Sequence, residues 1–370
     1  CLEKILLLEP NSYFGFLREG DIFHHFKRDN EALKSYKKCV KINRKDGRAY
    51  NNMGNVFVSK GQLKKAGKWY EKSNKYDPTS PIGWSNLGDT LDDLGQYKKA
   101  IECYNECINL NKKDTSAWNR KGIVLGKSGQ HKEAIECYNE CIKLDKKPAY
   151  AYNNIGKIFG DKGQYKKAIK CFGKAIKLDR EYAGAYSGKG SMLENLGQYK
   201  KAIKCFDKAI SLDEKWKYAW NGKGVALINL KEYKEAIKCF DKAISLDETK
   251  WKKYPWNRKG IVLGKSGQHK KAIKCFKEAI KLDEKFDYAW NNKGYSSFKL
   301  GGTQAALKCY NKAIKINPKP TLFWNNKAQL FYSMKKFDKA KLVNEHVLHI
   351  DPKDKDALAR RKKIKKKLNQ

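Results

Sequence analysis

The chain has 370 residues, and its 80 lysine and arginine residues against 40 aspartate and glutamate residues give a formal net charge of +40. No apolar run reaches 18 residues, so the sequence predicts no membrane-spanning helix. The charge favours anionic partners, and the alternative is a compositional bias of the genome toward lysine. Lysine far outnumbers arginine, however, whereas nucleic-acid sites usually use the planar guanidinium group as well.

Nearly the whole chain repeats with a period of 34 residues. We define the pivot of each unit by a glycine that recurs at this interval, apart from one step of 36 residues. An aromatic residue lies four positions before every pivot, and an alanine lies twelve positions after it. A period of this length predicts a solenoid, in which each unit packs against its neighbours, and solenoids mostly bind other molecules. The pivots are Gly20, Gly54, Gly88, Gly122, Gly156, Gly190, Gly224, Gly260 and Gly294, with Ala328 in a tenth unit.

The positions of the pivots predict three segments in chain order. Residues 1–12 resemble the tail of a preceding, truncated repeat, because Pro10 lies one period before Arg44 and two before Pro78, where a repeat closes. Residues 13–354 are predicted to hold ten tandem repeats. Residues 355–370 are predicted to form a C-terminal basic capping helix, since the end of a solenoid needs a polar cap. The basic run over 360–363 leaves a nuclear signal or a nucleic-acid contact as the alternative.

Residues 217–246 illustrate what each unit builds. The first half places Trp220, Gly224 and Leu227 at helical spacing. The second half puts its apolar residues on one helix face: Ala236, Ile237, Phe240, Ala243 and Ile244. Most units have Gly-Gln-Tyr or Gly-Gln-His between the halves, and this glycine suits the left-handed residue that ends a helix. The unit is predicted to be two helices joined by a tight turn, with the pivot glycine facing the alanine twelve positions on.

These residues resemble the tetratricopeptide repeat family. The motif W-x-x-x-G-x-x-L, then A-x-x-x-F-x-x-A, is carried by Trp220, Gly224, Leu227, Ala236, Phe240 and Ala243. The resemblance implies an all-α fold, a right-handed superhelical α-solenoid of helix-turn-helix repeats. First helices would line a concave groove, and second helices would form much of the convex surface. One departure is lysine in place of the family's buried leucine before the pivot, where we expect the stem to pack and the ammonium to reach water: Lys121, Lys189, Lys223, Lys259, Lys293 and Lys327.

Eleven cysteines recur at equivalent repeat positions. Such positions lie one or two helix diameters apart, which exceeds the reach of a disulfide. The thiols are therefore expected to be packing residues in a reducing, cytoplasmic setting. A zinc site at Cys103/Cys107 or Cys137/Cys141 is the alternative, but no CxxC spacing or convergent histidine supports it. His131 and His269, which replace the turn tyrosine, are expected to pack in the turns.

The candidate binding surface consists of two rows of polar residues just before the pivots. Asparagine is a mediocre helix former, so its repeated use inside a helix needs a reason. An amide offers both a donor and an acceptor, and could hold the backbone of an extended peptide. The family uses asparagines at the matching place as a ladder along its groove; the alternative is bonding to the backbone of the neighbouring repeat. The row two positions before the pivot is Asn52, Asn86, Arg120, Asn154, Arg258, Asn292 and Asn326, and the row three positions before it is Asn51, Asn119, Asn153, Asn221, Asn257, Asn291 and Asn325.

A row of tyrosines lies six positions before the pivots: Tyr150, Tyr218, Tyr254 and Tyr288. On the concave face these rings would add aromatic contacts, and the alternative is packing between repeats. The family also has a two-carboxylate clamp built from lysine and asparagine. This chain lacks the complete set, because asparagine and serine mainly replace the clamp's first lysine.

The predicted function is a non-catalytic scaffold that binds an extended segment of a protein partner in the groove, without a cofactor or metal. No Ser/His/Asp or Cys/His arrangement indicates an enzyme. One alternative is an adaptor for RNA or an acidic protein that binds through convex lysines such as Lys98, Lys166 and Lys200. Another is the recognition arm of a larger enzyme. The sequence identifies no partner.

Overall fold

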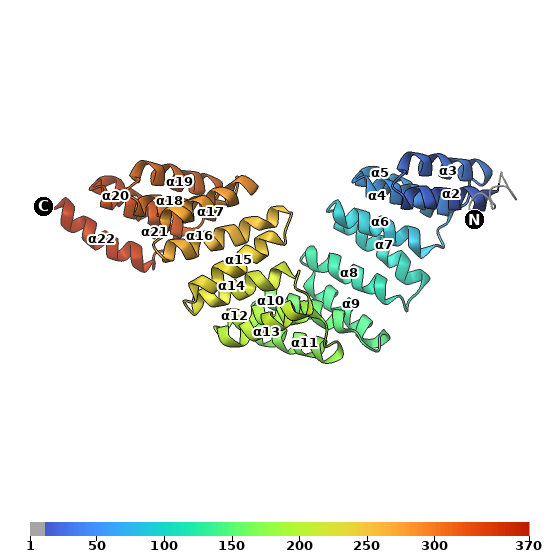
Figure 1. Ribbon diagram of the computed structural model, residues 1–370, viewed down its shortest axis with the longest axis horizontal. Coiled ribbons are helices and arrows are strands. Elements are labelled where there is room, and N and C mark those ends of the chain that lie inside the picture. The colour runs from blue at the N-terminus through green and yellow to red at the C-terminus, as the bar shows by residue number, and fades with distance from the viewer. Residues whose placement is uncertain (1–11, 370) are drawn as a thin grey trace. The chain divides into compact units, whose positions relative to one another are not determined.

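The computed structural model describes residues 12–369, which form 21 α-helices and one 3-10 helix without a strand among them. Contacts between residues divide the chain into two compact units, one ending at Arg180 and one beginning at Glu181 (Figure 1). The tail predicted for residues 1–12 lies almost entirely outside the described residues. Below, the even-numbered helices α2 to α20 are called first helices, and the odd-numbered helices are called second helices.

Unit 1 contains five helix pairs. They are α2 (Tyr13–His25) with α3 (Asp29–Ile42), α4 (Gly47–Ser59) with α5 (Leu63–Tyr76), α6 (Pro81–Asp93) with α7 (Tyr97–Leu110), α8 (Thr115–Lys127) with α9 (His131–Leu144), and α10 (Ala149–Asp161) with α11 (Tyr165–Leu178). Each first helix has 13 residues and each second helix has 14, so the 34-residue period appears directly as a repeated pair of helices.

Unit 2 contains five further pairs and a final helix. They are α12 (Ala183–Asn195) with α13 (Tyr199–Leu212), α14 (Lys217–Asn229) with α15 (Tyr233–Ser245), α16 (Lys253–Lys265) with α17 (His269–Leu282), α18 (Asp287–Lys299) with α19 (Thr303–Ile316), α20 (Thr321–Ser333) with α21 (Phe337–Ile350), and α22 (Lys355–Leu368). The two-residue insertion forms a short 3-10 helix, η1 (Lys250–Lys252), just before α16.

The turn within each pair requires a left-handed residue. Seven turns place glycine there, with φ between 68° and 83°. This confirms the role predicted for the glycine of the Gly-Gln-Tyr segment. Three turns place lysine there instead, at φ 58–63°: Lys27, Lys231 and Lys335.

Replacing Lys231 by glycine is expected to raise the free energy of unfolding by about 1 kcal/mol, because a Cβ atom disfavours this backbone region and glycine accepts it. Urea denaturation followed by circular dichroism measures the change. The matched control is the reverse substitution, Gly197→Lys, at the same turn position of another pair in unit 2, where φ is 72° and space is open. It should destabilise by a similar amount. A Lys231→Gly variant no more stable than the parent would contradict the assignment of backbone strain.

The pivot glycine makes room for an aromatic ring of its own helix pair. A Cβ atom added at any of the nine pivot glycines would lie 2.4–3.0 Å from a ring atom of the tyrosine or phenylalanine sixteen positions later. At Gly224, for example, the ring is that of Phe240, which is fully buried. The nearest neighbour of the glycine is thus this ring, whereas we predicted the alanine twelve positions on. A planar ring fills the space between the two helices, and no side chain fits beside it.

The tenth pair replaces both members of this contact together. Ala328 stands at the pivot, and Asn344 stands where the other pairs have the aromatic ring. The Asn344 side chain is completely buried, and its Nδ2 donates to the carbonyl oxygen of Ala357 in α22 at 2.9 Å. Without the ring, the pivot tolerates a methyl group and the vacated position holds the final helix.

The α22 helix occupies the place of an eleventh first helix. Arg360 corresponds to the row two positions before the pivot, and only 8% of it is exposed. Its guanidinium donates to Oδ1 of Asn325 and Oδ1 of Asn344, both at 2.9 Å, and to Oε1 of Gln329 at 3.3 Å. The basic helix expected from the sequence therefore packs as a cap through one buried arginine, while its other basic residues are exposed.

Tryptophan and lysine side chains close the joints between pairs. Five tryptophans donate Nε1–H to the carbonyl oxygen six residues earlier at 2.8–3.1 Å: Trp84, Trp118, Trp220, Trp290 and Trp324. In five units the lysine before the pivot places its ammonium 4.8–5.9 Å from the centre of the preceding indole ring. The predicted packing of the lysine stem is thus joined by a cation–π contact.

The first helices form the inner side of the curve within each unit. In unit 1, α2 packs on α4 and α8 on α10; in unit 2, α12 packs on α14, α16 on α18 and α20 on α22. Among residues 12–369, no two second helices of the same unit approach each other to this extent. Elements on the inside of a bend lie closer together than those outside. We call the surface made by the first helices of a unit its inner surface.

The ten described cysteines are free thiols, and eight of them are buried. Burial raises the pKa of Cys137 and Cys239 to about 11. Within the described residues, no three histidine, cysteine, aspartate or glutamate side chains gather as a metal ion would require. In the same part of the chain, every helix is too short or too polar to span a membrane.

Candidate functional site

The two predicted polar rows meet between neighbouring first helices. Asn86, Asn154, Asn292 and Asn326 each donate Nδ2–H to the Oδ1 atom of the asparagine three positions before the preceding pivot, at 2.9–3.1 Å. The acceptors are Asn51, Asn119, Asn257 and Asn291. The partner is therefore a side chain of the neighbouring repeat, whereas the alternative that we considered was its backbone.

Within three first helices the amides bond to the next residue of the same helix. Nδ2 of Asn291 lies 3.4 Å from Oδ1 of Asn292, and the pairs Asn51–Asn52 and Asn153–Asn154 repeat this distance. In unit 2 the bonds form one chain, from Asn326 through Asn291 and Asn292 to Asn257. In unit 1 a second chain runs from Asn86 through Asn51 and Asn52 to Asp21. Such chains polarise each member and fix its orientation.

The two rows differ in exposure. Among the inner members, Asn51, Asn153, Asn221, Asn257 and Asn291 are buried, while Asn119 and Asn325 are partly buried. The outer members Asn52, Asn86, Asn154, Asn292 and Asn326 are all partly exposed. The inner row thus supports the outer row, and the outer row presents the amides that a ligand could reach.

The two arginines in the outer row differ from each other. Arg120 forms an ion pair with Asp89 on the preceding first helix. Arg258 lies near Glu194, and desolvation lowers the pKa of Arg258 and raises that of Glu194. Asn221, the inner amide of α14, has a buried Oδ1 without a hydrogen-bond partner. The amide chain of unit 2 therefore begins at α16.

The tyrosine row divides into one packed residue and three exposed ones. Tyr150 packs against the buried cluster of α9 and α10, and burial raises its pKa to about 12. Tyr218, Tyr254 and Tyr288 are 47%, 40% and 45% exposed, and each makes edge contacts with rings of the adjoining loop or helix. The alternative of packing between repeats fits Tyr150, and the other three rings are accessible.

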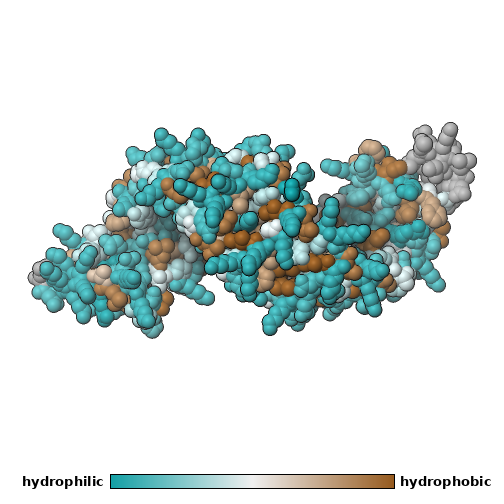
Figure 2. Space-filling model, turned by 90° about the horizontal axis from the view of Figure 1, so that it is seen from below, coloured by the Kyte–Doolittle hydropathy of each residue, from teal (hydrophilic) through white to brown (hydrophobic). Residues whose placement is uncertain are grey.

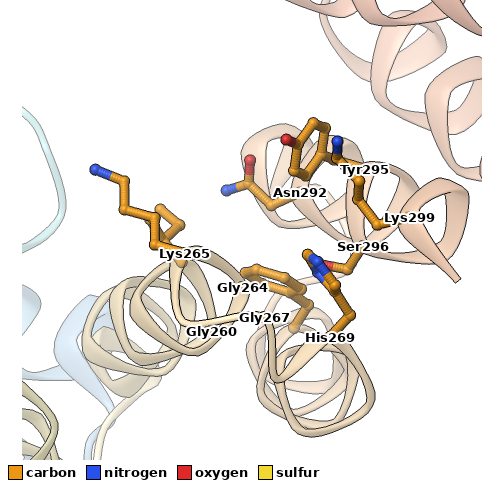
Figure 3. A pocket seen from close by; sticks show the side chains of 11 residues that line it. Gly260, Gly264, Lys265, Gly267, His269, Asn292, Tyr295, Ser296 and Lys299 are labelled. Atoms are coloured by element: carbon orange, nitrogen blue, oxygen red, sulfur yellow. The ribbon is translucent and has the colours of Figure 1, made fainter. Parts of the chain in front are cut away.

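A pocket of about 530 Å³ opens beside the amide chain of unit 2 (Figure 3). The end of α16, the start of α17 and the face of α18 form its walls. Gly264 leaves space between the helices, and Phe276 and Ile261 line the pocket with apolar atoms. Its polar members are Lys265, His269, Asn292, Tyr295, Ser296 and Lys299.

Among the pocket residues, only Asn292 was predicted from the sequence to bind a ligand. His269 was expected only to pack in its turn, but it lines the pocket, and its Nδ1 atom is buried without a hydrogen-bond partner. One sequence feature could have indicated the pocket: Gly264 lies inside a predicted helix and is not a pivot glycine. Glycine inside a helix is unfavourable by about 1 kcal/mol relative to alanine, so its presence calls for a packing or functional reason.

The second helices carry the exposed lysines of the anion-binding alternative, and none of the four lysines named for it lines this pocket. Lys98, Lys166, Lys200 and Lys270 are exposed at the starts of their helices, as predicted. The face in Figure 2 is mostly hydrophilic, with several patches of hydrophobic residues between the polar side chains.

The comparison with protein families decides the classification. Models described as tetratricopeptide repeat match residues 16–46, 47–80, 81–114, 115–148, 149–182, 183–215, 218–250, 254–286 and 288–320. The chain belongs to the tetratricopeptide repeat family. This tetratricopeptide repeat protein has nine matched repeats, and the pair α20–α21 follows them with the same helix lengths and the same tryptophan bond. Membership of the family supports a role as a protein-interaction scaffold.

Solved structures agree with the fold. Yeast Tom70 is similar with a TM-score of 0.50 and 16% identity, over 96% of this chain and 96% of that one. PilF of Pseudomonas aeruginosa is similar with a TM-score of 0.52 and 16% identity, over 58% of this chain and 97% of its own. At this identity the likeness concerns the fold alone. Among curated proteins, none matches the chain.

Proposed function

We propose that the inner surface binds an extended segment of a partner protein and holds it mainly through its backbone. The support is the bonding state of the outer amides. Asn292 uses one N–H for Asn257 and one lone pair of Oδ1 for Asn291. A primary amide has two donors and two lone pairs, so one of each remains for a ligand. A peptide group offers the matching pair.

The spacing of the amides suits an extended chain. Packed helices lie about 8–10 Å apart, and an extended peptide advances about 3.3 Å per residue. Consecutive outer amides would therefore meet the backbone about every third residue. Because the inner row already fixes these side chains, little conformational entropy is lost on binding. Repetition of weak contacts along one rigid surface supplies the affinity.

The test is selection of binders from a displayed library of random twelve-residue peptides, followed by titration of selected peptides. Replacing Asn292 and Asn326 together by alanine should weaken binding by about tenfold or more, since each lost hydrogen bond contributes of the order of 1 kcal/mol. The matched control is Asn195→Ala with Asn229→Ala. These are exposed asparagines on first helices of unit 2, and their Nδ2 atoms bond only within their own helix.

Backbone recognition has a second signature. Methylating single peptide nitrogens should weaken binding at about every third position, whereas replacing most single side chains should change it little. Affinity should also fall only gently with salt, because amides carry no charge. Equal binding to the Asn292/Asn326 variant and the parent would refute the proposal. A steep salt dependence that exposed lysines control would favour the anion-binding alternative instead.

A further inference from the structure

We propose that the pocket between α16, α17 and α18 binds an acidic side chain, aspartate or glutamate, of the segment held along unit 2. This inference rests on the proposed function and adds a side-chain preference to it. The volume of about 530 Å³ lies within the range of small-ligand sites, so it admits a carboxylate side chain with some of its water. Asn292 lines the pocket and also belongs to the amide chain, which places the pocket beside the proposed path of the peptide backbone.

The pocket carries positive charge that nothing in the structure neutralises. Lys265 and Lys299 line it from two neighbouring first helices, and no carboxylate is among its lining residues. Neither lysine forms an ion pair with any residue of 12–369. The ammonium of Lys299 lies 5.4 Å from the centre of the ring of Tyr295, which also lines the pocket. Two free ammonium groups on one pocket attract an anion.

An internal duplication shows that this charge is specific to unit 2. Residues 118–132 and 256–270 are identical, so Lys127 in α8 is the exact counterpart of Lys265. In unit 1, however, Lys127 forms an ion pair with Asp92 at 2.6 Å. The residue of unit 2 that corresponds to Asp92 is Ile228. The same lysine is therefore satisfied within one unit and unpaired in the other.

The first helix that follows α16, α18, is also more positively charged at this site than its unit 1 counterpart, α10. Lys299 in α18 corresponds to Asp161 in α10, and Ser296 corresponds to Ile158. The unit 1 site thus has an acid where the unit 2 site has a base. Around the common fifteen-residue segment, unit 1 has Asp92, Asp161 and Lys157 where unit 2 has Ile228, Lys299 and Tyr295. With the shared lysine included, these positions sum to no net charge in unit 1 and to two positive charges in unit 2. The difference points to an anionic ligand for unit 2 alone.

A buried side-chain atom of the pocket can donate a hydrogen bond to the carboxylate. Nδ1 of His269 is buried and has no hydrogen-bond partner in the structure, and a neutral imidazole can carry its hydrogen there. His131 in unit 1 has the same unpaired atom, so the lysines rather than the histidine make the distinction. A Cβ atom at position 264 would lie 3.6 Å from Oγ of Ser296 and 3.8 Å from Nδ1 of His269, so Gly264 keeps this space open. Apolar walls exclude part of the water and strengthen a charged contact.

The experiment titrates the intact chain with N-acetyl-glutamate N-methylamide and follows the His269 and Tyr295 side chains by NMR. We expect saturable shifts at both residues. The glutamine analogue should bind about five- to tenfold more weakly, as expected for loss of charge-assisted contacts. Lys299→Asp, which copies the unit 1 residue, and Lys265→Met should each reduce binding of the glutamate analogue by a similar factor. The control Lys127→Met removes the paired counterpart and should leave the titration unchanged.

A third ligand, N-acetyl-phosphoserine N-methylamide, is titrated in the same way. Three results would overturn the proposal: the glutamate and glutamine analogues bind equally, neither lysine substitution changes binding of the glutamate analogue, or only the phosphoserine analogue binds. The last result would assign the pocket to a phosphorylated segment. The titration does not depend on a selected peptide, so failure of the library selection and failure of the pocket are separate findings. If both succeed, peptides selected on the parent should be enriched in acids at one position, and peptides selected on Lys299→Asp should lose that enrichment.

Discussion

Replacing Gly122 by alanine should lower the free energy of unfolding by about 2 kcal/mol, although alanine is the better helix former. The new Cβ would lie 2.8 Å from Cε1 and 2.9 Å from Cζ of Tyr138, a ring that is only 3% exposed. The ring has no room to withdraw in a closely packed interior, so the two helices must separate. Because repeat arrays need not unfold in one step, the effect should be measured both by urea denaturation and by amide hydrogen exchange in α8 and α9.

The control for this prediction lies on the same helix. A Cβ added at Gly126 meets nothing within 4 Å, so Gly126→Ala should stabilise the chain by about 0.5–1 kcal/mol. A double substitution provides a second check. Tyr138→Leu removes the ring, and the added cost of Gly122→Ala should then become small, which gives a coupling energy of about 1 kcal/mol or more. If alanine is equally well tolerated at 122 and 126, the ring does not determine the pivot.

Arg360→Ala should cost about 3 kcal/mol and release α22 from the end of unit 2. The substitution removes three hydrogen bonds and leaves the completely buried Asn344 Oδ1 without its donor. Faster hydrogen exchange throughout α22, with little change in α16, is the expected result. Arg360→Lys should recover only part of the loss, because a single ammonium cannot reproduce the fork of the guanidinium.

The neighbouring arginine is a matched control for the cap. Arg361 forms an ion pair with Glu345 at 2.9 Å, but the two side chains are 45% and 38% exposed. Exposed pairs contribute little, so Arg361→Ala should change stability by less than about 1 kcal/mol. Undiminished protection of α22 in the Arg360→Ala variant would mean that apolar contacts such as that of buried Ile364 hold the cap by themselves.

Features that depend on one helix pair were predictable from the sequence. The spacing of Trp220, Gly224 and Phe240 predicted the two helices, and glycine predicted the left-handed residue in seven of the ten turns between them. Both are local consequences of helical periodicity and of the freedom of glycine. The pairing of pivot glycine with aromatic ring was missed, because the spacing of the residues does not say which of several apolar side chains crosses between the helices.

Features that depend on two pairs were only partly predictable. The repeated asparagines marked the inner surface, but the bond from Asn292 to Asn257 joins residues in different repeats and follows from how the pairs stack. The role of Asn344 was visible only as an exception to the pattern. The pocket was harder still, because Lys265 looks identical to Lys127 in sequence and differs only in the helices packed on either side. Whether the outer amides bind a peptide remains a prediction.

The duplicated segment around Lys127 and Lys265 bears on how such proteins diversify and how they are engineered. A copied repeat keeps its backbone, but its electrostatic character is set by the helices before and after it. Gene duplication can thus yield a new preference without any substitution in the copied stretch itself. For the same reason, moving one repeat into another array should not transfer its specificity, and the smallest transferable cassette is a repeat together with both of its neighbours.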